Sequence, residues 1–242
     1  MKVLSIGNSF SQDAQKYLHN IALADGYQLD CVNLMIGGCS LERHYNNMIS
    51  DAKEYSFELN GAAIGRMVSL SEALSEAEYD VITLQQVSQL SGRPQTYIPY
   101  VAILADYVRK MQPKAKLYFH RTWSYEWGYV TDKYVPYNSD QEEMYRRICD
   151  ATEMASKLIN AEVIPSGDAI QRLRALPEFD YRAGGISLCR DGFHMSLGYG
   201  RFAVGVVWYH TLTGKRPAIS TFGELDSALV TKIVDSVTEK AI

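Results

Sequence analysis

Short apolar runs alternate with longer stretches of helical periodicity along the whole chain. Five runs are apolar and β-branched, as buried strands are, and they cover residues 2–6, 29–36, 81–84, 116–120 and 162–165. Apolar positions recur at helical spacing between and after them, at residues 12–24, 41–50, 69–77, 97–111, 139–160, 169–176, 196–213 and 225–240. Residues 54–64 fit neither pattern cleanly and allow a short hairpin around Asn60-Gly61.

This alternation predicts an α/β fold, because parallel strands are joined by helices that cover both faces of the sheet. The expected architecture is a three-layer αβα sandwich with a central, mainly parallel five-stranded sheet of the flavodoxin-like kind. The 242 residues, 47% of them hydrophobic, are enough to bury one large core. No repeat, linker or low-complexity tract interrupts the pattern, so residues 1–242 are expected to form a single domain.

Charge and cysteine content narrow the range of partners. The formal net charge of -4 does not suit a surface that follows a nucleic-acid backbone. No apolar run approaches the roughly 20 residues that cross a bilayer, and the first residues lack the pattern of a secretory signal. The four cysteines form no CxxC pair, which favours free thiols in a reducing compartment. We therefore expect a cytoplasmic protein without nucleic acid or membrane as a partner; the oligomeric state stays open.

Polar residues follow four of the predicted strands. They occupy residues 7–11, 37–40, 85–88 and 120–123, and a further polar segment stands at residues 191–196. Ligands of parallel sheets bind beyond the carboxyl ends of the strands. These segments are therefore expected to converge on one site.

Ser9 has a candidate catalytic partner far along the chain. A serine hydroxyl attacks only with a base beside it, and a histidine base is oriented by a carboxylate. Asp191 and His194 are three residues apart, so one turn of chain can fold the carboxylate onto Nδ1 and leave Nε2 for Ser9. Taken alone, Ser9 also suits a helix cap, and His194 suits a structural position near a turn.

An acyl-transfer site also needs donors for a developing oxyanion. The backbone N–H of Gly38 is one candidate, because no Cβ blocks close approach. A side-chain amide from Gln85 or Gln86 is another. Adjacent strand residues point to opposite faces, so only one of the two glutamines is expected to reach the site.

These segments together resemble the sequence blocks of the SGNH (GDSL-like) hydrolases. GNSFS is similar to the first block, the segment around Gly38 to the second, and DGFHMS to the last, in the order of that superfamily. LQQVSQ and a Thr-Trp-x-Tyr segment resemble more narrowly the DUF4886 branch. The resemblance implies Ser9 as nucleophile, His194 as base and Asp191 as its orienting acid. It implies the N–H groups of Ser9 and Gly38 as oxyanion donors.

Two departures from the superfamily pattern affect the predicted site. Asn8 stands where an aspartate is usual, and LQQVSQ replaces the usual Gly-x-Asn-Asp. For the third donor we favour Gln86, since carbohydrate acetylesterases of this superfamily can place a glutamine there, with Gln85 as the alternative. Ser11 is expected to cap the first helix, with Asp13 in its first turn.

The segment after the fourth strand is rich in aromatic residues. Two Trp and four Tyr lie in residues 123–137, and they could form walls for sugar rings or pack on one another. We expect Asn8, His120, Trp123 and Tyr125 to contact substrate. The predicted reaction is hydrolysis of a small acyl ester, foremost deacetylation of a carbohydrate or similar polar molecule, without a cofactor or metal.

Three other functions are compatible with parts of the sequence. A metal-dependent hydrolase could use His120, His194 and Asp191, although no HxH or HExxH spacing supports it. A non-catalytic carbohydrate-binding protein could retain the same scaffold. A flavodoxin-like phosphate-binding protein would use the first strand-to-helix loop, which has one glycine and no lysine.

Overall fold

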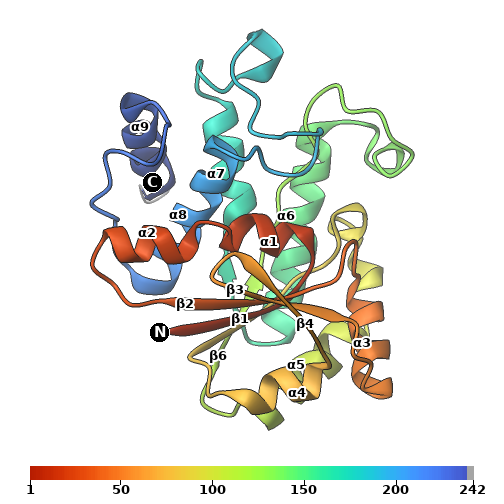
Figure 1. The fold of residues 1–242 in the computed structure, drawn as a ribbon. Coiled ribbons are helices and arrows are strands. Elements are labelled where there is room, and N and C mark those ends of the chain that lie inside the picture. The colour runs from red at the N-terminus through yellow and green to blue at the C-terminus, as the bar shows by residue number, and fades with distance from the viewer. Residues whose placement is uncertain (239–242) are drawn as a thin grey trace.

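The computed structural model describes residues 1–238, and its central sheet has seven strands in the order β4-β3-β2-β1-β5-β6-β7 (Figure 1). The strands are β1 (Lys2–Gly7), β2 (Asp30–Met35), β3 (Tyr55–Leu59), β4 (Ala62–Val68), β5 (Val81–Leu84), β6 (Lys116–His120) and β7 (Glu162–Ile164). β2, β1, β5, β6 and β7 pair in parallel, which confirms the predicted parallel core. The expected total of five strands is wrong, because the β3–β4 hairpin pairs antiparallel with β2 and extends the sheet.

Helices cover both faces of the sheet, as the alternating pattern predicted (Figure 1). They are α1 (Ser9–Gln15), α2 (Leu18–Ala24), α3 (Leu41–Ser50), α4 (Leu70–Glu76), α5 (Tyr100–Met111), α6 (Gln141–Leu158), α7 (Ser166–Arg174), α8 (Tyr199–Thr213) and α9 (Ser227–Thr238). α1, α2, α7, α8 and α9 pack into one core, and α3, α4 and α5 into the other. α6 contributes side chains to both. The result is the three-layer αβα sandwich.

Local sequence explains both the strands and the helix starts. Val3 and Leu4 of β1 are fully buried in opposite cores, because successive strand side chains point to opposite faces. α3, α4 and α6 each begin after a capping side chain, which accepts a hydrogen bond from a backbone N–H three residues on. The caps are Ser40, Ser69 and Asp140.

The first predicted helix, residues 12–24, is two helices in the structure. α1 begins earlier, at Ser9, and the chain breaks between Gln15 and Leu18 before α2. At the break, the Lys16 carbonyl lies against Gly61 of the hairpin, where an added Cβ would come within 2.4 Å of it. Lys16 Nζ also donates to the Gly61 carbonyl at 2.8 Å. The helix ends where a segment remote in sequence packs against it, a contact that periodicity does not reveal.

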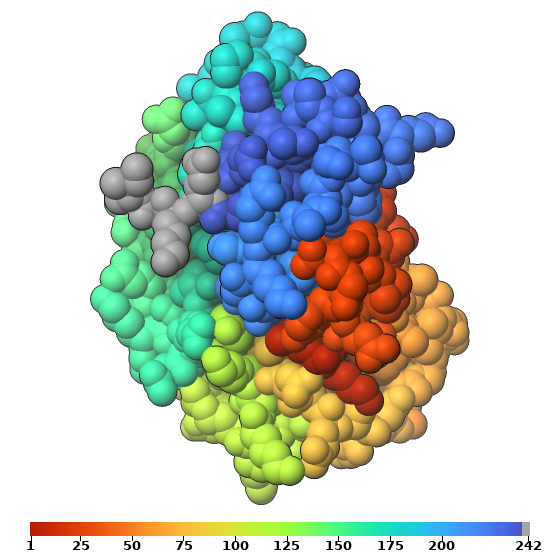
Figure 2. Space-filling model, turned by 90° about the vertical axis from the view of Figure 1, so that its left-hand side faces the viewer, coloured from red at the N-terminus to blue at the C-terminus, as the bar shows by residue number. Residues whose placement is uncertain are grey.

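The other predicted helices agree with the structure to within three residues at each described end. The predicted end of the last helix at residue 240 lies outside the described residues. Figure 2 shows the blue C-terminal segment against the red N-terminal one, in agreement with the packing of α8 on α1 and α2. Among residues 1–238, no helix combines the length and apolar character needed to cross a membrane.

Candidate active site

The turn from β1 into α1 places Ser9 at the first position of a helix. Asn8 is the N-cap, and its Oδ1 accepts the N–H of Phe10 at 3.0 Å. The Ser11 hydroxyl accepts the Asn8 N–H at 3.0 Å, so Ser11 belongs to a capping box, and the expectation that it is the cap itself is wrong. Gly7 is needed here, because a Cβ on it would lie 1.9 Å from the Ser11 hydroxyl oxygen.

The structure brings Ser9, His194 and Asp191 together. The Ser9 hydroxyl donates to His194 Nε2 at 2.9 Å, and His194 Nδ1 donates to Asp191 Oδ2 at 2.7 Å. Asp191 Oδ1 accepts the backbone N–H groups of His194 at 2.8 Å and Phe193 at 3.3 Å, so one carboxylate fixes both ring and turn. Burial raises the pKa of Asp191, but the hydrogen bonds from His194 outweigh it and hold that pKa below its ordinary value.

Ser9 and His194 open into a cavity of about 280 Å³ at the carboxyl ends of the strands. Its walls come from all the predicted strand-end segments except residues 120–123, whose continuation supplies Tyr125. The lining residues are Asn8, Ser9, Phe10, Gly37, Gly38, Val87, Ser88, Gln89, Tyr125, Tyr129, Thr131, Lys133, Phe193 and His194. The convergence expected for a parallel sheet is therefore present.

Two backbone N–H groups in this cavity are available to an oxyanion. Within residues 1–238, neither the N–H of Ser9 nor that of Gly38 has a hydrogen-bond partner. Gly38 has a φ of 63°, in the left-handed region that favours glycine. The next carbonyl, that of Cys39, accepts a hydrogen bond from Asn8 Nδ2 at 3.0 Å. The glycine loop is thereby fixed to the residue that precedes Ser9.

The two glutamines point in opposite directions, as adjacent strand residues should. Gln86 turns away from the cavity: its Oε1 accepts the Leu41 N–H at 3.1 Å and its Nε2 donates to the Thr96 carbonyl at 3.1 Å. Gln85 turns toward Asn8 and donates to Asn8 Oδ1 at 2.7 Å. Neither side chain lines the cavity, so the structure does not support the preference for Gln86 and does not place Gln85 as the donor in its stead.

Comparison with known proteins identifies the family to which this chain belongs. The family model described as "Domain of unknown function (DUF4886)" matches residues 2–224. The chain belongs to the DUF4886 family. A solved DUF4886 family protein from Bacteroides uniformis ATCC 8492 is 32% identical, over 98% of this chain and 93% of its own, with a TM-score of 0.90.

The DUF4886 chain also shares the fold of SGNH hydrolases, as its motifs implied. A proposed SGNH hydrolase from Slackia heliotrinireducens is 22% identical, over 88% of this chain and 98% of its own, with a TM-score of 0.59. The acetyl xylan esterase AlAXEase is 13% identical, over 86% of this chain and 98% of its own, with a TM-score of 0.55. Comparison with curated proteins gives no match.

Behind Asn8, this DUF4886 protein contains a buried series of hydrogen bonds, and each donor in the series can be assigned. Trp208 Nε1 can only donate, and it donates to the Ser166 hydroxyl at 3.2 Å. At the other end, Gln85 donates its amide N–H to Asn8 Oδ1, so its Oε1 accepts from His120 Nδ1 at 2.8 Å, and the Ser166 hydroxyl donates to His120 Nε2 at 2.9 Å. Burial lowers the pKa of His120 to about 3, so the ring is neutral and can accept at Nε2. The buried series holds the Gln85 amide in this orientation.

His120 and Trp123 are supporting residues in the structure. Their side chains are 1% and 0% exposed and lie outside the cavity lining, so the expected contact with substrate is not supported. Trp123 stacks on Phe10 at a centroid distance of 4.3 Å and donates its indole N–H to the Phe193 carbonyl at 2.7 Å. It therefore holds the turn that carries the histidine. Of the predicted aromatic contacts, only Tyr125 lines the cavity.

The aromatic segment 123–137 divides between core and surface. Trp123, Tyr134 and Tyr137 are buried, which fits packing of the segment on its own aromatics. Tyr125 and Tyr129 line the cavity, which fits the expectation of an aromatic wall. The segment thus contributes to both the core and the cavity, and its contact with a sugar stays a prediction.

An ion cluster that we did not anticipate connects the two halves of the site. Asp13 is fully buried on α1, one turn after Ser9, and accepts from Arg190 at 2.9 Å and from Arg201 at 2.7 Å. It also accepts the Met195 N–H at 2.9 Å, so it contacts both residues that flank the Asp-x-x-His turn. A carboxylate on the apolar face of a helix was the available signal, since buried charges require partners.

The geometry gives no support to a metal-dependent hydrolase. In the described part of the chain, no group of three or more His, Cys, Asp or Glu side chains is arranged to hold a metal ion. His120 is hydrogen-bonded by Gln85 and Ser166, and His194 by Ser9 and Asp191.

Proposed function

We propose that this chain is a serine ester hydrolase that removes a small acyl group, foremost acetyl, from a carbohydrate or a similarly polar molecule. The observation that carries the proposal is the continuous hydrogen-bonded series from the Ser9 hydroxyl through His194 to Asp191. This is the arrangement that activates a serine for nucleophilic attack.

In the proposed reaction, Ser9 Oγ bonds to the ester carbonyl carbon while its proton passes to His194 Nε2. Asp191 holds the Nδ1–H and stabilises the imidazolium. The developing oxyanion accepts hydrogen bonds from the N–H groups of Ser9 and Gly38. Collapse of the intermediate breaks the ester C–O bond, and His194 returns the proton to the leaving alcohol. Water then hydrolyses the acyl-enzyme with His194 again as base.

The size and lining of the cavity favour a short acyl group. Its volume of about 280 Å³ lies just below the ~300 to 1,000 Å³ of typical ligand sites. Tyrosine, threonine, glutamine and lysine side chains in the wall suit a polar alcohol better than a long hydrocarbon. The acetyl xylan esterase that shares the fold is consistent with this proposal.

Hydrolysis of p-nitrophenyl acetate and octanoate tests the proposal. We expect Ser9→Ala and His194→Ala each to lower kcat roughly 1,000-fold or more. Ser88→Ala, which removes another cavity hydroxyl, should cost less than about tenfold. The acetate should be preferred over the octanoate by roughly tenfold in kcat/KM. Unchanged turnover in Ser9→Ala contradicts the nucleophile, and preference for octanoate contradicts the small acyl group.

A further inference from the structure

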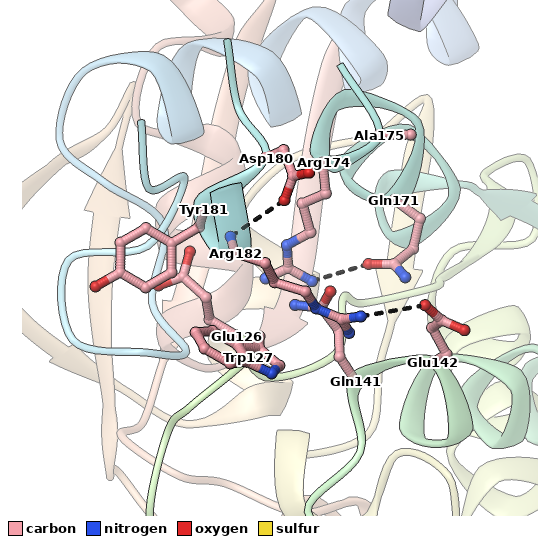
Figure 3. Close-up of a pocket in the computed structure, with 10 residues that line it drawn as sticks. All are labelled: Glu126, Trp127, Gln141, Glu142, Gln171, Arg174, Ala175, Asp180, Tyr181 and Arg182. Atoms are coloured by element: carbon pink, nitrogen blue, oxygen red, sulfur yellow. Dashed lines mark hydrogen bonds and ion pairs between the residues drawn. The ribbon is translucent and has the colours of Figure 1, made fainter. Parts of the chain in front are cut away.

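The structure has a second cavity, of about 230 Å³ (Figure 3). Glu126 and Trp127 line it, whereas the preceding residue, Tyr125, lines the catalytic cavity. Glu126 N–H donates to the carbonyl of Gly192, within the Asp-x-x-His turn, at 2.8 Å. The two cavities therefore lie on either side of one segment of chain.

Figure 3 shows side chains from four places in the chain converging on this cavity. Besides the loop carrying Glu126, these are the start of α6, the end of α7 and the short helix η4 (Tyr181–Ala183). Three of the lining groups are planar and polar: a carboxylate from Glu126, an amide from Gln171 and a guanidinium from Arg174. Such groups offer hydrogen bonds in fixed directions.

Glu126 and Arg174 are a buried acceptor and a partly buried donor that do not pair directly. Glu126 is only 6% exposed, and among residues 1–238 it forms no ion pair within 4.0 Å. Burial raises the pKa of Glu126, although the hydroxyl of Ser187 donates to its carboxylate. Arg174 Nη1 donates to Gln171 at 2.9 Å and to Ser124 at 3.2 Å, and Nη2 makes only a long contact of 3.5 Å with Cys189 Sγ. A ligand hydroxyl can donate to one group and accept from the other.

The charges lining the cavity nearly cancel. Three carboxylates, of Glu126, Glu142 and Asp180, face two guanidiniums, of Arg174 and Arg182. Arg182 and Glu142 already approach each other at 3.6 Å. A strongly charged ligand of either sign would meet repulsion from part of this lining. A neutral ligand with several hydroxyl groups meets none.

Two aromatic side chains complete the lining. Trp127 is 51% exposed and Tyr181 is 47% exposed, so both leave apolar ring surface open to a ligand. Flat aromatic faces suit the apolar faces of sugar rings, while polar groups around them suit the ring hydroxyls. We propose that this second cavity binds a neutral saccharide unit. The proposal deepens the proposed function, on which its carbohydrate substrate rests, but its test is binding alone.

The test uses the full chain and four neutral, unacetylated probes: tetrasaccharides of xylose, glucose, mannose and galactose. Calorimetric titration should detect binding of at least one. Trp127→Ala and Tyr181→Ala should each weaken that binding by roughly tenfold, because each removes an aromatic contact. Val135→Ala, a change at a 62% exposed residue of the same segment, should bind as the parent does.

A second arm locates the bound saccharide. Protein phosphonylated on Ser9 has a blocked catalytic cavity and should bind the same probe with unchanged affinity. Failure of all four probes to bind overturns the proposal. So does wild-type affinity in both aromatic variants, or loss of binding on phosphonylation. Hydrolysis of p-nitrophenyl acetate, measured separately, tells whether the proposed esterase itself has failed.

Discussion

Asn8 has three hydrogen-bonding tasks, and an aspartate could perform only two of them. Its Oδ1 accepts from the Phe10 N–H and from Gln85 Nε2, and its Nδ2 donates to the Cys39 carbonyl. A carboxylate has no proton to give to that carbonyl. The departure from the usual Gly-Asp-Ser is therefore matched to the Gly38-Cys39 loop of this chain.

Asn8→Asp should lower kcat for p-nitrophenyl acetate roughly 10- to 100-fold with little change in KM. The new carboxylate would face the Cys39 carbonyl in a buried position and displace the loop that carries the Gly38 N–H. Asn46→Asp adds the same charge at an exposed position of α3 and should leave kcat unchanged. A wild-type kcat for Asn8→Asp contradicts this role.

Alanine substitutions of Gln85 and Gln86 should differ in effect: the first should mainly lower turnover, and the second should mainly lower stability. Gln85→Ala removes one hydrogen-bond partner from Asn8 and one from His120, so kcat should fall roughly tenfold or more. Gln86→Ala should lower the free energy of unfolding by about 1 to 3 kcal/mol with a smaller effect on kcat. Both quantities are measured by steady-state kinetics and urea denaturation. The opposite pattern would return the oxyanion role to Gln86.

The sequence predicts that Ser9, His194 and Asp191 lie together, because their positions are local or follow a strand end. Asp191 and His194 contact each other within one turn, and Ser9 follows the first strand by two residues. The glutamines differ in direction: at the end of β5, one side chain points to Asn8 and the other to Leu41 and Thr96. Two adjacent glutamines between apolar residues do not reveal which of them points in which direction. The preference for Gln86 came from resemblance and not from geometry.

At the scale of elements, α1 and the turn after Cys189 form the two halves of the site. The backbones of Cys189 and Met195 pair as an isolated antiparallel β-bridge, which closes the turn. The Arg190 N–H donates to the His194 carbonyl at 2.9 Å. Asp13 then connects this closed turn to α1. The geometry between serine and histidine thus depends on an ion cluster outside the triad.

Arg190→Ala and Arg201→Ala form a matched pair of tests. Each removes one guanidinium from Asp13 and should lower the free energy of unfolding by about 1 to 3 kcal/mol. Only Arg190 belongs to the turn, so Arg190→Ala should also lower kcat roughly tenfold with KM little changed. Equal kcat values for the two variants would limit the cluster to a structural role.

Element boundaries were predictable where they depend on local caps and periodicity. The hairpin's place in the sheet was not, because it depends on remote contacts. Glu58 of β3 accepts from Asn33 of β2 at 2.8 Å, and Asn33 accepts from Ser11 at 2.7 Å. The hairpin thereby supports the start of α1, although neither its sequence nor its spacing indicates this.

At the scale of the whole molecule, folding buries two titratable histidines, His44 and His120. Burial lowers the pKa of both His44 and His120 from 6.5 to about 3. The unfolded chain therefore takes up protons between these values that the folded chain does not. Stability must then fall as the pH decreases through that window.

We expect the free energy of unfolding to decrease from pH 6.5 toward pH 4.5, as guanidinium denaturation at several pH values would show. Burial raises the pKa of Glu126, so the folded chain binds this proton more readily than the unfolded chain. Glu126 therefore reduces the slope of the free energy of unfolding against pH by the equivalent of at most one proton. His44→Phe removes one titrating ring outside the catalytic site and should reduce the slope by about one proton. An unchanged slope contradicts burial of neutral His44.

The most direct test of the central claim is covalent labelling with a fluorophosphonate, followed by intact-mass measurement and mapping of the modified peptide. We predict a single adduct on Ser9 in the wild-type chain, none in Ser9→Ala, and much slower labelling in His194→Ala. An adduct that persists in Ser9→Ala, or a wild-type chain that hydrolyses esters without being labelled, would contradict the account.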